Sequence, residues 1–363
     1  MNNEVILKGR SLRELEEIFQ ELDEPRYRAK QAFRRLNRLL ARSMDEFSEF
    51  PLALRARLED MGALPALDLK KREVGGDGTE KLLFEIGSEH ARRGARLIET
   101  VKIPSARRRT ICVSSQSGCS LNCTFCATGR LEFRGNLETW HILDQIYEFA
   151  RNAEEPLTNV VFMGMGEPFY NYDNVMRAAR ILNHPEGLNL GARHITISTA
   201  GVLPRIEQFI AAGEPFNLAV SLNHADSRER DKIMGINKKY PLDKLLSVCR
   251  KFTKILGRKI TFEYIMISGY NMDEHAARKL IKVARSVHCK INLIPLNTTF
   301  EGMRRPEERE IEAFQARLYE ANVPVFLRGS PGRDINAACG MLAASNAASN
   351  SASGSASGSG ASR

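Results

Sequence analysis

The spacing of hydrophobic residues divides the chain into a short helical part and a longer part in which strands and helices alternate. Between residues 12 and 22 apolar side chains recur every three or four positions, and a capping-box pattern begins at Ser11. A second helix is predicted after Pro25, and a third begins near Pro51, because proline suits the first helical position. We therefore expect residues 1–62 to form a small helical domain.

Alternation of apolar and polar residues replaces this helical spacing in the next part of the chain. Two alternating runs flank the turn sequence Gly-Gly-Asp-Gly at residues 75–78, which predicts a β-hairpin. A third run covers residues 95–103. We expect residues 63–104 to form this hairpin and the strand that follows it.

Short apolar runs and amphipathic helical patterns then alternate through residues 105–342. This alternation predicts parallel strands with crossover helices, but it does not by itself distinguish an open sheet from a barrel. Residues 343–363 are low in complexity and carry nothing to bury, which predicts a disordered tail. The strand-like runs are 110–115, 158–162, 194–198, 217–222, 260–267, 290–294 and 323–327.

Composition places the chain among soluble globular proteins, with 43% hydrophobic and 27% charged residues. No run of eighteen apolar residues and no signal peptide is found, so we expect no membrane segment and no export. Four of the seven cysteines cluster in residues 112–126. The total number of cysteines is odd, and most of them are clustered. Both features favour metal and redox chemistry in a reducing cytoplasm over a disulfide scaffold.

The net charge of +9 and the pI near 9.2 indicate an anionic partner. The second predicted helix concentrates this charge, and we predict that it contacts an RNA backbone. The alternative is that its charge serves only solubility. The basic residues of this helix are Arg26, Arg28, Lys30, Arg34, Arg35, Arg38 and Arg42.

Three cysteines in a Cys-x3-Cys-x2-Cys spacing, Cys119, Cys123 and Cys126, are the strongest chemical signal. Thiolates are soft ligands suited to iron–sulfur clusters or zinc. A cluster of four irons usually takes four cysteines, so three local thiols leave one iron open. A Cys3His zinc site is the alternative, but the nearest downstream histidine, His141, has no second Cys or His beside it.

This spacing, followed by Ala127-Thr128-Gly129, resembles the radical S-adenosylmethionine (SAM) superfamily. The resemblance implies an α/β fold with a partial (β/α)6 barrel and one [4Fe–4S] cluster whose open iron chelates SAM. Electron transfer from the cluster would cleave SAM to a 5′-deoxyadenosyl radical. Phe125, between the last two cysteines, would shield the cluster from water.

Polar residues at the predicted carboxyl ends of the strands suit a cofactor bound at the barrel mouth. Gly164-Met-Gly-Glu-Pro168 directly follows one strand, and in the radical SAM resemblance Gly166 and Glu167 contact the amino group of SAM. Taken singly, each of the other polar positions is as well explained by a cap or turn. The further expected SAM contacts are Ser198, Ser221, Leu222, Asn223 and Asn297.

Two cysteines outside the triplet stand apart from the other free thiols. Alternation along the strand places Ile111 and Val113 on one face and Cys112 on the other, which we expect to face the barrel lumen. Cys339 follows the last strand, far from the other motifs. We expect Cys249 and Cys289 to be inert core residues.

Together these motifs and the C-terminal Ala337-Ala-Cys-Gly340 resemble the RlmN/Cfr family of RNA methyltransferases over residues 5–343. The resemblance implies that one SAM methylates Cys339 and that a second SAM supplies the radical that activates this methyl group for addition to adenine. Glu99 would remove the ring proton, and Cys112 would form a disulfide with Cys339 to release the product. The implied partners are 23S rRNA or tRNA and an electron donor such as flavodoxin or ferredoxin, and we expect a cytoplasmic monomer.

The sequence departs from the family pattern at the SAM and RNA sites. Asn223 stands where the family usually has histidine, the tryptophan of the second helix is absent, and residues 130–134 replace a Gln- and Gly-rich stretch. Methylation of carbon 2 or carbon 8 of adenosine therefore stays open, and the complete N-terminal helical domain favours carbon 2.

Two other classes of function stay open. A different radical SAM reaction, such as methylthiolation or activation of a glycyl-radical partner, would need neither Cys112 nor Cys339. A non-catalytic RNA-binding protein with a structural cluster would need no SAM loop at Gly166 and Glu167.

Overall fold

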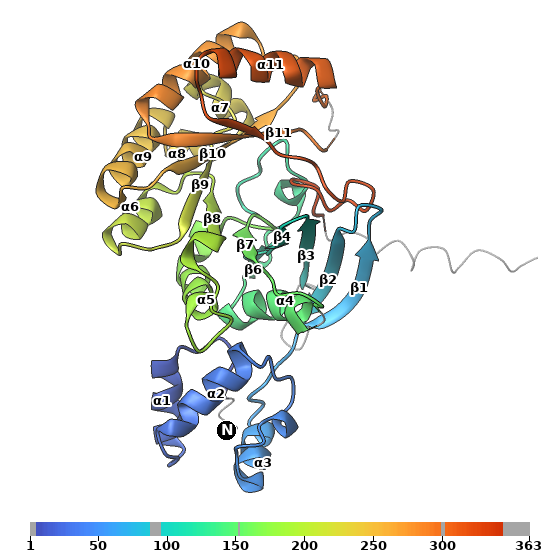
Figure 1. The fold of residues 1–363 in the computed structure, drawn as a ribbon, viewed down its shortest axis with the longest axis vertical. Coiled ribbons are helices and arrows are strands. Elements are labelled where there is room, and N and C mark those ends of the chain that lie inside the picture. Colours follow the sequence, from blue (N-terminus) through green and yellow to red (C-terminus); the bar gives the residue numbers. More distant parts are fainter. Residues whose placement is uncertain (1–4, 88–95, 152, 299–301, 344–363) are drawn as a thin grey trace, which may run out of the picture.

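The computed structural model describes residues 5–87, 96–151, 153–298 and 302–343. Ten strands form one curved mixed sheet in the order β1-β2-β3-β4-β7-β8-β9-β10-β11-β12 (Figure 1). Its strands are β1 (Asp68–Val74), β2 (Glu80–Ile86), β3 (Arg96–Ser105), β4 (Arg108–Cys112), β7 (Asn159–Phe162), β8 (Ile195–Thr199), β9 (Asn217–Ser221), β10 (Ile260–Met266), β11 (Cys289–Pro295) and β12 (Val325–Leu327).

The sheet changes direction at β4. Strands β1 to β4 pair antiparallel as a hairpin and its extension, and β4 to β12 are parallel. Within the described residues the two edge strands, β1 and β12, do not pair, so the parallel strands form an open, partial barrel. The predicted α/β architecture with a β-hairpin extension is present.

Helices cover the outer side of the parallel strands (Figure 1). Their burial follows the helical period: in α9 the buried residues are Leu242, Leu245, Cys249 and Phe252. Cys249 is therefore a core residue, as predicted, and so is Cys289 at the start of β11. The helices are α4 (Thr139–Arg151), α5 (Tyr172–Asn183), α6 (Leu203–Ala211), α7 (Ser227–Ile233), α8 (Ile236–Lys239), α9 (Leu242–Leu256), α10 (Glu274–Ser286) and α11 (Glu308–Glu320).

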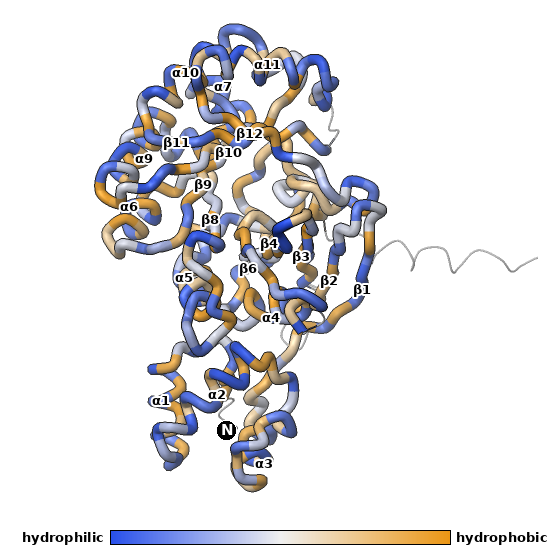
Figure 2. Tube along the Cα trace, in the orientation of Figure 1, coloured by the Kyte–Doolittle hydropathy of each residue, from blue (hydrophilic) through white to orange (hydrophobic). Residues whose placement is uncertain are grey.

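The N-terminal part contains the three predicted helices, α1 (Leu12–Glu21), α2 (Tyr27–Asn37) and α3 (Leu52–Asp60). The capping box at Ser11 is formed, because Ser11 and Glu14 exchange side-chain and backbone hydrogen bonds. Apolar side chains from all three helices are buried together. Figure 2 shows hydrophobic and hydrophilic positions alternating along these helices. No helix among the described residues has the length and apolar character needed to cross a bilayer.

A buried ion pair joins this helical part to the barrel. Nζ of Lys8 lies 3.1 Å from each carboxylate oxygen of Asp144 on α4, and the backbone N–H of Leu67 donates to the same carboxylate at 3.2 Å. Burial lowers the pKa of Lys8, while Asp144 opposes this shift. Tyr147, one turn further along α4, donates its hydroxyl to Asn37 of α2 at 2.7 Å.

We predict that Asp144→Ala destabilises the protein by about 3–5 kcal/mol, because it leaves the Lys8 ammonium buried without its partner. Urea unfolding followed by circular dichroism measures this change. The double variant Lys8→Met/Asp144→Leu is the control, since it removes both charges and should recover most of the loss. Equal stability of Asp144→Ala and the wild type would show that the ion pair does not hold the two parts together.

Candidate active site

The predicted metal-binding cysteines lie in one loop at the carboxyl end of β4. Cys119, Cys123 and Cys126 are half-buried and form no disulfide. The backbone N–H of Cys126 donates to the carbonyl of Cys123 at 3.1 Å, which closes a tight turn. Phe125, between them, is buried, as expected for a residue that excludes water from the site.

The donor set fits a cluster better than a single ion. Among the described residues no three His, Cys, Asp or Glu side chains converge on one metal position. A single zinc would need its ligands about 2.3 Å away on all sides, whereas a cubane offers a separate iron to each thiolate. Burial raises the pKa of Cys119 to about 12 and also raises the pKa values of Cys123 and Cys126. Three such thiols ionise only beside strong positive charge, which an iron–sulfur cluster supplies.

The glycine loop after β7 is joined by backbone hydrogen bonds to the segment that leads into the cysteine loop. The N–H groups of Ser115 and Gln116 both donate to the carbonyl of Met165, at 2.9 and 3.2 Å. Gly166 has φ +97°, and a Cβ added there would lie 2.5 Å from Cβ of Gln116. Only glycine permits this approach, so Gly166 brings the glycine loop against the cysteine segment.

Glu167 is buried beside this contact. Its Oε1 accepts from the N–H of Phe169 at 2.9 Å and its Oε2 from the N–H of Ala200 at 2.7 Å. Burial raises the pKa of Glu167 to about 7, against the effect of these backbone donors. A cation bound here would stabilise the carboxylate, as the ammonium of an amino acid would.

The other expected SAM contacts lie at the carboxyl ends of neighbouring strands, but two of their side chains point elsewhere. Asn223, with φ +56°, accepts from the N–H of Ile265 at 3.0 Å. Asn297 donates to the carbonyl of Cys339 at 3.1 Å. The rest of this rim, at the carboxyl ends of the strands, is formed by Ser198 in β8, Ser221 at the end of β9 and the buried Leu222 after it.

Arg230 on α7 belongs to the same rim, although no sequence motif marked it. It is fully buried and donates to the carbonyls of Ala200, Ser221 and Leu222 at 2.7, 3.0 and 3.0 Å. Burial lowers its pKa to about 10, while the nearby Cys123 opposes this shift. Arg230 therefore fixes the ends of two strands and places positive charge next to the cysteine loop.

The two outlying cysteines lie near a second, half-buried arginine. Burial raises the pKa of Cys112 to about 12, with a smaller contribution from Cys339, while Arg328 opposes the shift. Cys339 in turn raises the pKa of Arg328. Arg328 follows β12 and lies 3.9 Å from the carboxylate of Glu263 and 3.3 Å from the sulfur of Met163. Its position after the last strand gave no local signal in the sequence.

Glu99 on β3 is buried, so the alternative of an exposed strand residue is excluded. Its carboxylate lies 3.2 Å from Nζ of Lys81 and accepts from the N–H of Ala343 at 2.9 Å. Lys81 is also buried and lies 3.3 Å from Glu73. Lys81 was not identified from the sequence. The antiparallel pairing of β2 with β3 places it diagonally across from Glu99.

The C-terminal segment that carries Cys339 is fastened at both ends of its loop (Figure 1). The hairpin tip holds one end: Gly332 donates to Asp77 at 2.9 Å, and Gly76 donates to Asp334 at 2.8 Å. The cysteine loop holds the other end, since Ala127 donates to the carbonyl of Gly340 at 2.8 Å. The hairpin extension thus contributes to the site by positioning the Cys339 segment.

Several basic side chains of helix α2 form ion pairs with acidic residues around the helix. Arg35 lies 2.6 Å from Glu49, Arg28 contacts Glu24 at 3.9 Å, and Lys30 lies 3.1 Å from Glu186 in the barrel. Arg34 and Arg38 are exposed, and no ion pair of either is found among the described residues. Arg38 donates to the carbonyl of Pro185 at 3.5 Å, and both arginines are exposed enough to contact another molecule.

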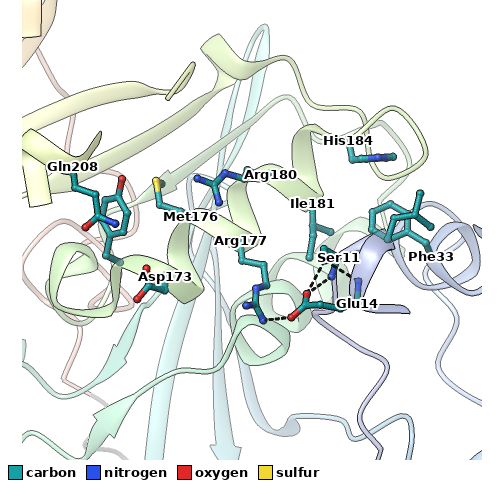
Figure 3. A pocket seen from close by; sticks show the side chains of 12 residues that line it. Ser11, Glu14, Phe33, Asp173, Met176, Arg177, Arg180, Ile181, His184 and Gln208 are labelled. Carbon is teal, nitrogen blue, oxygen red and sulfur yellow. Dashed lines mark hydrogen bonds and ion pairs between the residues drawn. The ribbon is translucent and has the colours of Figure 1, made fainter. Parts of the chain in front are cut away.

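A cavity of about 510 Å³ lies beside α2, where the N-terminal helices meet α5 (Figure 3). Arg177 of α5 reaches across it to Glu14 of α1 at 3.1 Å. Arg180 also lines this cavity, together with Glu14 and Asp173, so its lining carries charges of both signs.

Comparisons with known proteins agree with this geometry. The family model of the radical SAM superfamily matches residues 113–281. A probable dual-specificity RNA methyltransferase RlmN from Leptospira interrogans is 49% identical over 342 residues, 94% of this chain and 96% of that protein. The dual-specificity RNA methyltransferase RlmN from Syntrophobacter fumaroxidans is 40% identical, over 94% and 98% of the two chains. The crystal structure of a radical SAM methyltransferase from Sphaerobacter thermophilus superposes with a TM-score of 0.89 at 38% identity, over 94% and 99%.

The fastening of the C-terminal segment predicts the reactivity of Cys339. We expect Asp77→Ala and Asp334→Ala each to increase the rate at which an alkylating reagent labels Cys339 about five-fold, since each removes a hydrogen bond worth about 1 kcal/mol. Mass spectrometry of digested protein measures the rate at each cysteine. Asp68→Ala, at the other end of the hairpin, is the matched control and should leave the rate unchanged. Wild-type rates in both test variants would mean that the hairpin does not hold the segment.

Proposed function

Because the chain belongs to the RlmN family of radical SAM RNA methyltransferases, we propose that it methylates carbon 2 of an adenosine in 23S rRNA, and in tRNA, through a methylated Cys339. The relatives named above are called dual-specificity RNA methyltransferases, which supports more than one RNA substrate. The radical SAM α/β fold expected from the cysteine motif is confirmed. The observation that carries the proposal is the convergence of Cys112, Cys339 and Arg328 beside the cysteine loop.

Cys119, Cys123 and Cys126 would hold one [4Fe–4S] cluster, and Gly166 and Glu167 would bind the amino group of SAM. With both bound, the site is supplied with a transferable methyl group and a 5′-deoxyadenosyl radical. Ser198, Ser221 and Leu222 would line the remainder of the SAM site, with Asn223 contributing its backbone. Asn297 would act by holding the carbonyl of Cys339. The electron would come from a donor of the flavodoxin or ferredoxin type.

The environments of the two cysteines support different roles. Cys339 is half-buried on the C-terminal segment and would accept the methyl group after losing its thiol proton. Cys112 is buried with a pKa of about 12, so it stays a neutral thiol and does not compete for the methyl group. Arg328 would stabilise whichever sulfur becomes anionic.

Glu99 would accept the proton from the adenine ring carbon. Lys81 at 3.2 Å compensates the carboxylate, and the N–H of Ala343 orients it toward the Cys339 segment. Lys81 is therefore a positioning residue in this proposal.

Cys112 would complete the reaction. The thiol of Cys112 would give up its proton as its sulfur attacks the sulfur of Cys339, a disulfide would form, and the bond between that sulfur and the transferred carbon would break. The released carbon gains a proton and becomes the methyl group of the product. An external thiol would then reduce the disulfide.

A different radical SAM reaction is the competing function, and it has no use for the pair Cys112 and Cys339.

The exposed arginines of α2, Arg34 and Arg38, would contact the RNA backbone and position it without taking part in the chemistry.

The two cysteines can be separated by substitution. We expect Cys339→Ala to carry no methyl group and to release no methylated RNA. We expect Cys112→Ala to accept the methyl group and add to the base without resolving the adduct, so that it is isolated bound to RNA. A nuclease-sensitive mass shift detects this adduct. Cys249→Ala, which changes a core cysteine away from the site, is the control and should turn over normally. Normal turnover by Cys112→Ala without trapped RNA would rule out the paired-cysteine mechanism.

The basic helix predicts a salt-dependent change in RNA binding. Reversing Arg34 and Arg38 to Glu should weaken binding and reduce the slope of log affinity against log salt by about one to two, because each phosphate contact contributes about one. SAM cleavage without RNA should not change. Arg278→Glu/Lys282→Glu on α10 has the same spacing and exposure and serves as control. An unchanged slope in the α2 variant would assign its charge to solubility.

A further inference from the structure

A second cavity, of about 610 Å³, occupies the interior of the partial barrel and extends from the amino ends of the parallel strands to Met163 and Arg328 of the candidate active site. Asn159, Thr196, Thr261 and Lys290 line it, and each is the first or second residue of a parallel strand. Pro104 and Ser105 of β3 and residues 326–329 lie on opposite sides of it. The cavity therefore lies at a seam between β12 and the end of β3 that extends beyond β2, residues 103–105, and its volume is that of a small-molecule site.

The strand register aligns three side chains in one row across this cavity. Glu263 pairs with Asn292, and Asn292 pairs with Phe326, along β10, β11 and β12. Residues in register on parallel neighbours share a face, and all three line the cavity. The row thus presents a carboxylate, an amide and an aromatic ring to the same space.

The carboxylate in this row is incompletely satisfied. Glu263 is 4% exposed, and its Oε1 accepts from the amide of Asn292 at 3.0 Å. Its Oε2 is buried and accepts no hydrogen bond within the described residues, and Arg328 lies 3.9 Å from it. Buried carboxylate oxygens seldom lack a donor, so the position calls for an N–H or O–H group from a ligand.

The outer part of the cavity has the opposite character. Phe326 is 56% exposed and presents its ring to this cavity. Arg108 and Lys290 are exposed at the same cavity, and no ion pair of either is found in the described part of the chain. Hydrogen-bond acceptors thus lie inside, an aromatic surface lies at the seam, and free cations lie at the rim.

We propose that this cavity binds one nucleotide unit, with its base stacked on Phe326, an N–H edge of the base donating to Glu263, and its phosphate between Arg108 and Lys290. Bases stack on aromatic side chains, carboxylates accept from exocyclic amino groups, and arginine and lysine bind phosphate. The unit is a residue of bound RNA or a free mononucleotide, which share this chemistry. The choice of RNA as the source rests on the proposed function, whereas the site itself does not.

The test uses the full chain with its cluster reconstituted and with saturating SAM, so that the SAM site is occupied. Equilibrium dialysis with each of the four 5′-nucleoside monophosphates should detect binding. Phe326→Ala, Arg108→Glu and Lys290→Glu should weaken it about five- to hundred-fold, the range of one stacking interaction. Ile255→Ala, whose residue is also 56% exposed, and Arg309→Glu are matched controls. Glu263→Gln should reduce the preference for bases with an amino group over uridine, which a purely structural role would not change.

Two further arms identify the source of the nucleotide. If the Phe326 variant also binds substrate RNA more weakly than the control variants, the unit belongs to the RNA; equal RNA affinity assigns the site to a free nucleotide. If the wild-type protein binds nucleotide but does not methylate RNA, the proposed function is contradicted and the proposed nucleotide site is still supported. No nucleotide binding by the wild type, or equal binding by the cavity and control variants, would overturn the site.

Discussion

The catalytic site depends on how the C-terminal segment is held over the carboxyl ends of the strands. This segment makes hydrogen bonds to the hairpin tip through Asp77 and Asp334, to the cysteine loop through Gly340, and to Glu99 through Ala343. None of these partners is near it in sequence, and each bond is modest. Together they place one thiol, that of Cys339, between the cysteine loop and the second thiol, that of Cys112.

Charge compensation is the second constraint on this site. Burial would disfavour every ionised group that the chemistry needs, and each of these groups has a cationic neighbour that is buried or half-buried. Arg230 lies beside Cys123, Arg328 beside Cys112 and Cys339, and Lys81 beside Glu99. These cations also hold backbone carbonyls or strands in place, so the same residues serve the fold and the electrostatics.

The interior of the barrel is divided at the row that contains Glu263. The carboxyl ends of the strands above it face the cysteine loop, and the amino ends below it surround the second cavity. Ser221 pairs with Glu263 in register, so the expected SAM rim and the cavity adjoin. An open barrel allows this arrangement, because the seam between β3 and β12 admits a ligand from the side.

The sequence by itself determined the elements and the chemistry that depends on local spacing. Hydrophobic periodicity was sufficient for the three N-terminal helices, the hairpin and the parallel strands, because each of these patterns is local. The cysteine spacing and the glycine loop after β7 were likewise readable, since their residues act within one turn or loop.

Tertiary structure alone decided which distant residues meet. Arg328, Arg230 and Lys81 carry no local signal, because a buried cation is identified only by the groups packed around it. The side chains of Asn223 and Asn297 turned toward the protein for the same reason: their hydrogen-bond partners, Ile265 and the carbonyl of Cys339, come from other segments. Burial and partner choice are properties of the packed chain, and a linear pattern does not contain them.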